Sequence, residues 1–270
     1  MRGPIPFREL VAVVTGASSG IGERIARDLA ARGTRVALVA RRAERLAVVA
    51  REIEGDGGHA FPVPGDVGER AAVEAAIRRV VDQHGSVDIL VNAAGFGRHV
   101  LFKDHPIDDI ERMTRTNWLG TVYAVKAALP SMRAQRRGWI VNIASIAGRL
   151  AQPDEAAYSA TKFAVAGLSE ALAYELEPLG IRVLAVYPGL VRTEMITPAV
   201  LARMPERVNT TAIEPAEVSR AVLRALERGR REVTVPGWMA MAYAVRALFP
   251  GLHHRMTGRV RLPAIPDLTR

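Results

Sequence analysis

The sequence has no cysteine among its 270 residues. This absence excludes disulfide bonds, thiolate nucleophiles and metal sites built on cysteine ligands, and we expect no metal. Aromatic residues make up only 5% of the chain and apolar residues 49%, so alanine, valine and leucine must fill the interior. No apolar run reaches the roughly 18 residues that cross a bilayer, and we expect no signal peptide. These absences favour a cytoplasmic α/β protein.

Lysine is almost absent as well, because arginine supplies 34 of the 37 basic side chains. One of the three lysines, Lys162, lies four residues after Tyr158, and positions i and i+4 share one face of a helix. An ammonium there would favour the phenolate and lower a tyrosine pKa that is about 10 in isolation. Such a phenol can exchange a proton with a carbonyl or alcohol oxygen. An ordinary pair on a helix surface is the alternative interpretation.

Glycine is concentrated in the segment Thr15–Gly22, which reads TGASSGIG and follows an apolar run that begins at Leu10. A helical pattern comes directly after it, and this order of strand, glycine turn and helix is what a dinucleotide site requires. Gly16 would allow a tight turn, Gly20 would allow backbone N–H groups to approach a pyrophosphate, and Gly22 would allow close helix packing. The N-terminus of the helix would present N–H donors to the phosphates.

Together these residues resemble the short-chain dehydrogenase/reductase family, and the resemblance runs from about Leu10 to Val235. It implies a catalytic set of four residues, Asn117, Ser145, Tyr158 and Lys162. The cofactor contacts that the glycine motif and the resemblance imply are Gly16, Ser18, Ser19, Gly20, Ile21, Gly22, Asp66, Val67, Asn92, Ala93, Ala94, Gly95, Tyr158, Lys162, Pro188, Gly189, Val191 and Thr193.

The resemblance also implies how the catalytic residues share the work. Ser145 would hydrogen-bond a substrate oxygen, and Tyr158 would transfer the proton while the nicotinamide exchanges a hydride with the same carbon. Lys162 would lower the pKa of Tyr158 and also bond the nicotinamide ribose. Asn117 would hold a water that links Lys162 to solvent.

Apolar runs alternate with longer helical patterns along the chain. Strands are predicted at Val11–Thr15, Arg35–Ala40, His59–Pro62, Val87–Asn92, Trp139–Ala144, Arg182–Tyr187 and Glu232–Val235. Helices are predicted at Gly20–Arg32, Arg42–Asp56, Arg70–His84, Ile107–Gln135, Asp154–Leu179 and Pro215–Glu227. This alternation predicts a single doubly wound Rossmann domain, a parallel seven-stranded sheet with helices on both faces. The strand order 3-2-1-4-5-6-7 is implied by the resemblance.

The end of the second predicted strand indicates which cofactor is bound. Sites for NAD often place an acidic residue there to hold the ribose 2′-hydroxyl. This chain has Ala40 followed by Arg41 and Arg42, and its next carboxylate is Glu44. Arginine can form charge-assisted bonds to a 2′-phosphate, so NADP(H) is favoured over NAD(H). The alternative is that both arginines only begin a solvated helix.

The net charge of +9 and the isoelectric point near 10.7 suggest an acidic partner such as a carrier protein or a membrane surface. Most of the arginines are scattered, so an arginine-biased composition with solvated side chains is the simpler explanation. The basic clusters lack the aromatic stacking residues of a nucleic-acid binder, and we expect no nucleic-acid partner.

Residues 237–270 are predicted as a C-terminal extension beyond the catalytic domain of residues 1–236. The extension is rich in apolar side chains, namely Trp238, Met239, Met241, Tyr243, Val245, Leu248 and Phe249, and basic residues follow at His253, His254, Arg255, Arg259 and Arg261. It could be a plain packed helix, a cover over the substrate crevice, a subunit interface or a membrane-surface segment around residues 237–252.

The sequence therefore predicts a cytoplasmic oxidoreductase that uses NADP(H) on the carbonyl or alcohol group of a fairly apolar small molecule. A ketoacyl reductase that serves an acidic carrier protein is one alternative, motivated by the net charge. A catalytically idle regulator that binds NADP(H) is another, although the intact set of Ser145, Tyr158 and Lys162 argues against it. The resemblance also implies a homodimer or homotetramer.

Overall fold

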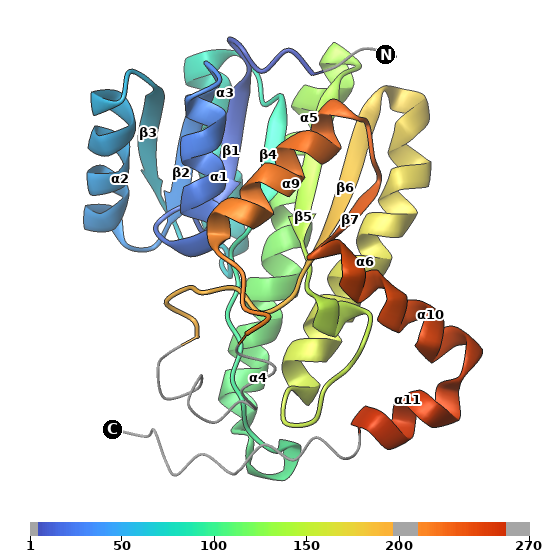
Figure 1. The fold of residues 1–270 in the computed structure, drawn as a ribbon. Helices are drawn as coiled ribbons and strands as arrows, with labels where there is room; N and C mark the ends of the chain where they lie inside the picture. Colours follow the sequence, from blue (N-terminus) through green and yellow to red (C-terminus); the bar gives the residue numbers. More distant parts are fainter. Residues whose placement is uncertain (1–4, 197–209, 258–270) are drawn as a thin grey trace.

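A computed structural model describes residues 5–196 and 210–257, and its centre is one seven-stranded sheet (Figure 1). All neighbouring strands are parallel, in the order β3-β2-β1-β4-β5-β6-β7. The strands are β1 (Val11–Thr15), β2 (Arg35–Ala40), β3 (His59–Pro64), β4 (Ile89–Asn92), β5 (Gly138–Ile143), β6 (Ile181–Pro188) and β7 (Glu232–Val235). The predicted fold class and strand order are therefore confirmed.

Helices cover both faces of this sheet (Figure 1). One face is covered by α1 (Gly20–Ala30), α2 (Ala43–Gly55) and α9 (Pro215–Glu227). The other is covered by α3 (Arg70–His84), α5 (Gly120–Gln135) and α6 (Ala156–Leu176). Three short helices lie beyond the carboxyl ends of the strands, namely α4 (Ile107–Met113), α10 (Met241–Leu248) and α11 (Pro250–Thr257).

The two faces of β1 show why its sequence is apolar without alternation. Ala12 and Val14 pack into the core under α1 and α9, whereas Val11 and Val13 pack into the core under α3 and α5. Successive side chains of a strand point to opposite faces, so a strand that is covered on both faces needs an apolar residue at every position. The carboxyl ends of the central strands are thus the place where polar groups can gather.

The single helix predicted over Ile107–Gln135 is in fact three segments. Helix α4 ends at Met113, a π-helical turn η2 (Thr114–Leu119) follows, and α5 begins at Gly120. A π-turn adds one residue to the helical repeat and is frequent at functional sites. Hydropathy does not indicate this insertion, because the apolar spacing on both sides of it remains helical.

Two other boundaries differ from the prediction for local reasons. Helix α6 begins at Ala156 rather than at residue 154, because Asp154 has a left-handed backbone with φ of 57°. Strand β4 begins at Ile89 rather than at residue 87. The amide of Val87 donates to the Ser131 hydroxyl, and the Asp88 carboxylate accepts from the Val11 amide. At Val87 a side chain thus takes the place of a strand partner, whereas the Asp88 amide still donates to the Val11 carbonyl at 2.8 Å.

The predicted extension begins as a 3₁₀ turn, η5 (Gly237–Ala240), and continues as α10 and α11. Residues 258–270, which include the predicted basic positions Arg259 and Arg261, lie outside the described residues. Within the described ranges, no helix combines the length and the apolar character that crossing a membrane requires.

Candidate active site

Buried amides from β4 and β5 pair at the carboxyl ends of these strands. Asn92 and Asn142 are in register, and the Asn92 Nδ2 donates to the Asn142 Oδ1 at 2.8 Å. The Asn142 Nδ2 in turn donates to the Ser169 Oγ of α6 at 2.9 Å. Buried amides are costly unless they are hydrogen-bonded. This series of hydrogen bonds therefore fixes β4, β5 and α6 relative to one another.

The glycine-rich loop packs tightly against the segment that follows β4. The Thr15 Oγ1 accepts hydrogen bonds from the amides of Ala93 and Ala94, both at 3.2 Å. Gly16 has a φ of 68°, and a Cβ built on it would lie 2.7 Å from the Ala94 nitrogen. A Cβ on Gly22 would collide with the Gly16 carbonyl oxygen, so this glycine is required by the turn itself.

The N-terminus of α1 is suited to bind an anion. Ser19 occupies its N-cap position without a side-chain capping bond. The first-turn N–H groups of a helix have no partner within the helix, and the helix dipole is positive at this end. A pyrophosphate fits such a terminus, and the close approach that Gly16 and Gly22 allow fits it as well.

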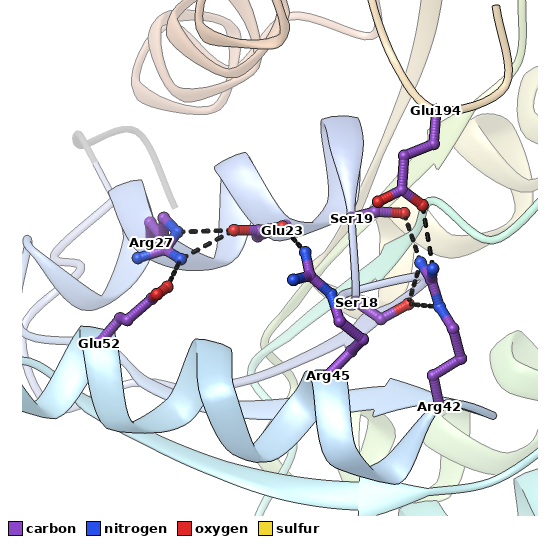
Figure 2. Close-up of polar contacts among 8 residues, drawn as sticks. All are labelled: Ser18, Ser19, Glu23, Arg27, Arg42, Arg45, Glu52 and Glu194. Carbon is purple, nitrogen blue, oxygen red and sulfur yellow. Dashed lines mark hydrogen bonds and ion pairs between the residues drawn. The ribbon is translucent and has the colours of Figure 1, made fainter. Parts of the chain in front are cut away.

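Arg42 reaches from the N-terminus of α2 to this loop (Figure 2). Its Nη2 donates to the hydroxyls of Ser18 at 3.1 Å and Ser19 at 2.9 Å, and its Nη1 lies 3.0 Å from the Glu194 Oε2. Arg41 extends elsewhere, with its Nη1 3.8 Å from the Asp66 Oδ2. Of the two predicted phosphate ligands, Arg42 is therefore the one that meets the cofactor loop.

Ion pairs between α1 and α2 hold the helix that carries Arg42 in place (Figure 2). Arg27 of α1 binds Glu23 on its own helix and Glu52 on α2. Arg45 of α2 lies 4.0 Å from the Glu23 carboxylate. These contacts fix the position of α2 beside the glycine-rich loop.

Two of the predicted cofactor contacts, Asp66 and Val67, follow β3. The Asp66 Oδ1 accepts from the Gly68 amide at 2.9 Å, which closes a tight turn. Val67 is buried, and its carbonyl oxygen would lie 2.8 Å from a Cβ on Gly120. Asp66 and Val67 thus occupy a fixed position next to Arg41 at the end of the second and third strands.

The segment after β6 returns to the glycine-rich loop. The Gly189 amide donates to the Val235 carbonyl at 2.8 Å, and Val191 forms a bridge with Ile213. A Cβ on Gly20 would lie 3.0 Å from the Thr193 Cγ2. The predicted residues Pro188 to Thr193 therefore run from the carboxyl end of β6 to the start of α1.

Ser145, Tyr158 and Lys162 converge at the end of β5. The Lys162 Nζ donates to the Ile143 carbonyl at 2.9 Å and lies 5.7 Å from the centroid of the Tyr158 ring. The Ser145 side chain is hydrogen-bonded to that of Tyr158. The Ser145 Oγ also accepts from the Ala147 amide at 3.1 Å, which fixes the hydroxyl oxygen.

Asn117 is buried in the π-helical turn and faces the same site. Its Oδ1 accepts from the Phe96 amide at 3.0 Å, and its Nδ2 donates to the Phe96 carbonyl at 2.8 Å and to the Thr161 Oγ1 at 3.1 Å. A Cβ on Gly95 would lie 3.1 Å from the Asn117 Oδ1 and 3.4 Å from the Lys162 Nζ. The side chain clamps the loop after β4 to α6, and the water that it was expected to hold stays a prediction.

Similarity to known proteins agrees with this arrangement. The family model described as short chain dehydrogenase matches residues 10–203. The mouse protein dehydrogenase/reductase SDR family member 7B is 32% identical over 272 residues, which cover 97% of this chain and 84% of that protein. The chain belongs to the short-chain dehydrogenase/reductase family.

Two further relatives of this short-chain dehydrogenase/reductase extend the comparison. The 11-beta-hydroxysteroid dehydrogenase-like 4A of Arabidopsis thaliana is 35% identical over 245 residues, which cover 90% of this chain and 81% of that protein. A solved structure of a short chain dehydrogenase/reductase from Burkholderia phymatum in complex with NAD has a TM-score of 0.84 and 25% identity, and the match covers 98% of this chain and all of that one. The chain is thus an oxidoreductase of this family type.

The electrostatics of this short-chain dehydrogenase/reductase differ from the sequence prediction at Tyr158. Burial raises the pKa of Tyr158, the negative charge of Glu155 raises it further, and the hydrogen bond with Ser145 lowers it. Burial also lowers the pKa of Lys162 to about 8. The pKa of Tyr158 is therefore raised and not lowered as expected, and loss of hydration around the phenol is the largest cause.

Several residues of the site were not predicted. Asn142 interrupts an otherwise apolar strand, which is a signal that the sequence does contain. Glu194, next to the predicted Thr193, gave no such signal, and neither did His99 or Glu155. Their roles depend on contacts between segments that are distant in the sequence.

Proposed function

We propose that this chain is an NADP(H)-dependent oxidoreductase that interconverts a carbonyl and an alcohol on a fairly apolar substrate. The observation that carries the proposal is the convergence of Ser145, Tyr158 and Lys162 beside a glycine-rich loop and an uncapped helix N-terminus. A nicotinamide dinucleotide fits these residues, and when bound it would supply or accept the hydride at the substrate carbon.

The side chains divide the remaining chemistry. Ser145 orients the substrate oxygen through its hydroxyl, which lies within hydrogen-bonding reach of Tyr158. Tyr158 gives its proton to that oxygen in reduction and takes it back in oxidation. The phenol is protonated at neutral pH, as proton donation in reduction requires, and its raised pKa keeps it protonated at higher pH as well. Lys162 contributes a positive charge that favours the phenolate when Tyr158 has to act as a base.

The preference for NADP(H) is supported by Arg42. Its guanidinium lies with two hydroxyl groups, those of Ser18 and Ser19, beside the loop that would bind the cofactor. A 2′-phosphate would bring two negative charges to these donors, whereas a ribose hydroxyl would leave the guanidinium without an anionic partner other than Glu194. The relative that is bound to NAD is the reason why this preference needs a direct test.

The cofactor preference predicts different effects of Arg42→Ala on the two cofactors. We expect Kd for NADPH to rise about tenfold, because a charge-assisted bond to phosphate is lost at a partly exposed site. Kd for NADH should change less than twofold. Arg41→Ala is the matched control, and it should have the smaller effect because Arg41 extends toward Asp66. Fluorescence titration of each variant with each cofactor, compared with the wild type, measures these Kd values. Equal losses of affinity for NADPH and NADH would contradict the proposal.

An apolar substrate is supported by the side chains around the carboxyl ends of the strands. Met239 of η5 packs against Gly189, since a Cβ there would lie 2.7 Å from the Met239 Sδ. Leu101 and Phe102 are exposed in the segment that follows β4. The similarity to a plant protein named as steroid-dehydrogenase-like points in the same direction. NADPH consumption with a series of ketones of increasing length tests this, and a preference for the smallest ketones would contradict it.

A further inference from the structure

Two titratable side chains outside the proposed catalytic set meet beside Tyr158. His99 lies in the segment after β4, and Glu155 is the N-cap residue of α6, one helical turn before Tyr158. The His99 Nδ1 is 3.2 Å from the Glu155 Oε1, and the two side chains are only 14% and 18% exposed. A carboxyl group that is so far withdrawn from water needs a partner, because burying its charge alone is costly.

The backbone brings these two side chains together independently of their charges. The Val100 amide donates to the Asp154 carbonyl at 2.8 Å, which ties the segment after β4 to the start of α6. Gly97 lies against the ring of Tyr158, since a Cβ there would be 3.0 Å from the Tyr158 Cδ2. The same segment therefore carries the partner of Glu155 and one wall of the tyrosine site.

His99 is the basic side chain in contact with Glu155. Arg98 precedes it in the sequence but forms an ion pair with Asp109 of α4. The titratable and charged groups around Glu155 are His99 and Arg98 from the segment after β4, with His105 close to Arg98, Asp109 from α4, Asp154 next to Glu155 in the chain, and Tyr158 and Lys162 from α6.

The charge of Glu155 changes within the neutral pH range. Burial, followed by repulsion from Asp154, raises the pKa of Glu155 to about 7. The ionised form of Glu155 in turn raises the pKa of Tyr158, as the second cause after burial. The charge state of this pair is therefore felt at the phenol, although Glu155 itself does not have to touch the substrate.

We propose that Glu155, with His99 as its partner, is a positioning residue that sets the pH range in which Tyr158 releases its proton. This inference rests on the proposed function of Tyr158 as proton donor and acceptor. When Glu155 is ionised, its negative charge keeps the phenol protonated and favours reduction of the carbonyl. When Glu155 is neutral, the phenolate forms more readily and oxidation of the alcohol becomes easier.

Glu155→Gln tests the proposal because it keeps the size of the side chain and removes its charge. We measure kcat/KM against pH in both directions, with one alcohol–ketone pair. In oxidation, the midpoint of the alkaline limb should fall by about 0.5–1 pH unit. Glu175→Gln is the matched control, since Glu175 is exposed on the same helix, and its profile should equal that of the wild type.

The partnership is tested by adding His99→Asn to each background. In the wild-type background, His99→Asn should move the midpoint of the alkaline limb of the oxidation profile, because the charge of Glu155 loses its partner. In the Glu155→Gln background it should leave the limb where it is, which is the non-additivity expected of two residues that act as one unit.

The outcomes separate this inference from the proposed function. A wild-type protein that turns over no carbonyl or alcohol, or a Tyr158→Phe variant that remains active, would overturn the proposed function and this inference with it. An active wild type with an unshifted limb in Glu155→Gln overturns only the inference. A uniform loss of rate with an unshifted limb shows that Glu155 is merely structural and overturns it too.

Discussion

At the scale of single residues, the environment of Tyr158 is set by opposing influences. Burial and Glu155 make the phenol harder to ionise, and the bond with Ser145 makes it easier. Lys162 is itself buried, and its pKa of about 8 means that its ammonium begins to lose its proton in mildly alkaline solution. The acid–base behaviour of the site is thus a property of four neighbouring groups and not of the tyrosine–lysine pair alone.

Tyr158→Phe should abolish turnover while leaving cofactor affinity nearly unchanged. The substitution removes the transferable proton and keeps the ring that lies against Gly97. Loss of general acid–base catalysis should lower kcat by about 10² to 10⁴. Steady-state rates and NADPH titration check this, and retention of more than about a tenth of the activity would refute the role of Tyr158.

Lys162→Met should lower activity and move the alkaline limb of the oxidation profile to higher pH, opposite to Glu155→Gln. Without the ammonium the phenolate loses a favourable charge, so the pKa of Tyr158 rises. The difference from the wild type should be largest below about pH 8, because above this value the wild-type lysine is losing its own charge. A pH–rate profile of both proteins measures this, and an unshifted limb would mean that Lys162 serves only to bind.

At the scale of elements, a cluster of arginine and aromatic side chains anchors α10 to the edge of the sheet. The Arg149 Nη2 donates to the Tyr187 hydroxyl at 2.9 Å and to Glu232 at 2.6 Å. Its guanidinium lies over the rings of Tyr187 at 4.6 Å and Tyr243 at 5.9 Å. Arg246 of α10 donates back to the Arg149 carbonyl. The segment is therefore docked beside the proposed active site.

The stretch from η5 to α11 carries exposed apolar side chains. Its exposed apolar residues are Trp238, Met241, Leu248, Phe249 and Leu252. Met239 of the same stretch packs against Gly189, at the carboxyl end of β6. This arrangement favours a role in substrate range or in location over a role in the chemistry.

Deletion of residues 238–270 should raise KM for long apolar ketones about tenfold and leave KM for small ketones nearly unchanged. The physical reason is the loss of apolar surface that a large substrate would contact. Deletion of residues 258–270 alone is the control and should have little effect on either. If the two truncated proteins have the same KM for long ketones and the same KM for small ketones, the crevice-cover interpretation is contradicted.

The membrane alternative for this segment has a separate readout. If the exposed side lies on a lipid surface, the intact protein should sediment with anionic vesicles, and added salt should weaken that binding. The protein without residues 238–270 should then fail to sediment. Sedimentation that is equal in both proteins would exclude this segment as the site of attachment.

At the scale of the whole molecule, the proposed functional groups lie together at the carboxyl ends of the parallel strands. Strands β1, β4, β5 and β6 all end there, and their parallel direction places the glycine-rich loop, Asn92, Ser145 and Gly189 on the same side. Burial of carboxyl and ammonium groups at these strand ends lowers the free energy of unfolding of the whole fold, because the charged groups lose hydration there.

That cost predicts a pH-dependent effect of Glu155→Gln on the free energy of unfolding. The folded-state pKa of Glu155 is raised from 4.5 to about 7, so its favourable contribution is present below pH 4.5 and is lost as pH rises through about 7. Glutamine has no charge to lose. The variant should therefore gain roughly 1–3 kcal/mol over the wild type between about pH 4.5 and pH 8.5. Urea unfolding at both values measures this, and a pH-independent difference would contradict the raised pKa.

The sequence by itself determined the fold, and the residues proposed for the cofactor site stay a prediction made from it. Apolar strands that alternate with helical patterns predicted the parallel sheet, and the bounds of β1, β2, β7, α3 and α9 agree with prediction. The turn at Gly16 was predictable because its chemistry is local: a positive φ and a close backbone approach leave room for no other residue. Tyr158 and Lys162 were identified by their spacing of four residues, and Ser145 by the resemblance to the family.

Only the tertiary structure decided how these groups behave. The contact of Arg42 with Glu194, the pair of His99 with Glu155 and the bonds of Asn117 to Phe96 and Thr161 all join segments that are distant in the sequence. The direction of the Tyr158 pKa was predicted wrongly for the same reason. A sequence shows that a lysine is one turn away, but hydration depends on everything that packs around the phenol, and here burial is the largest influence on its pKa.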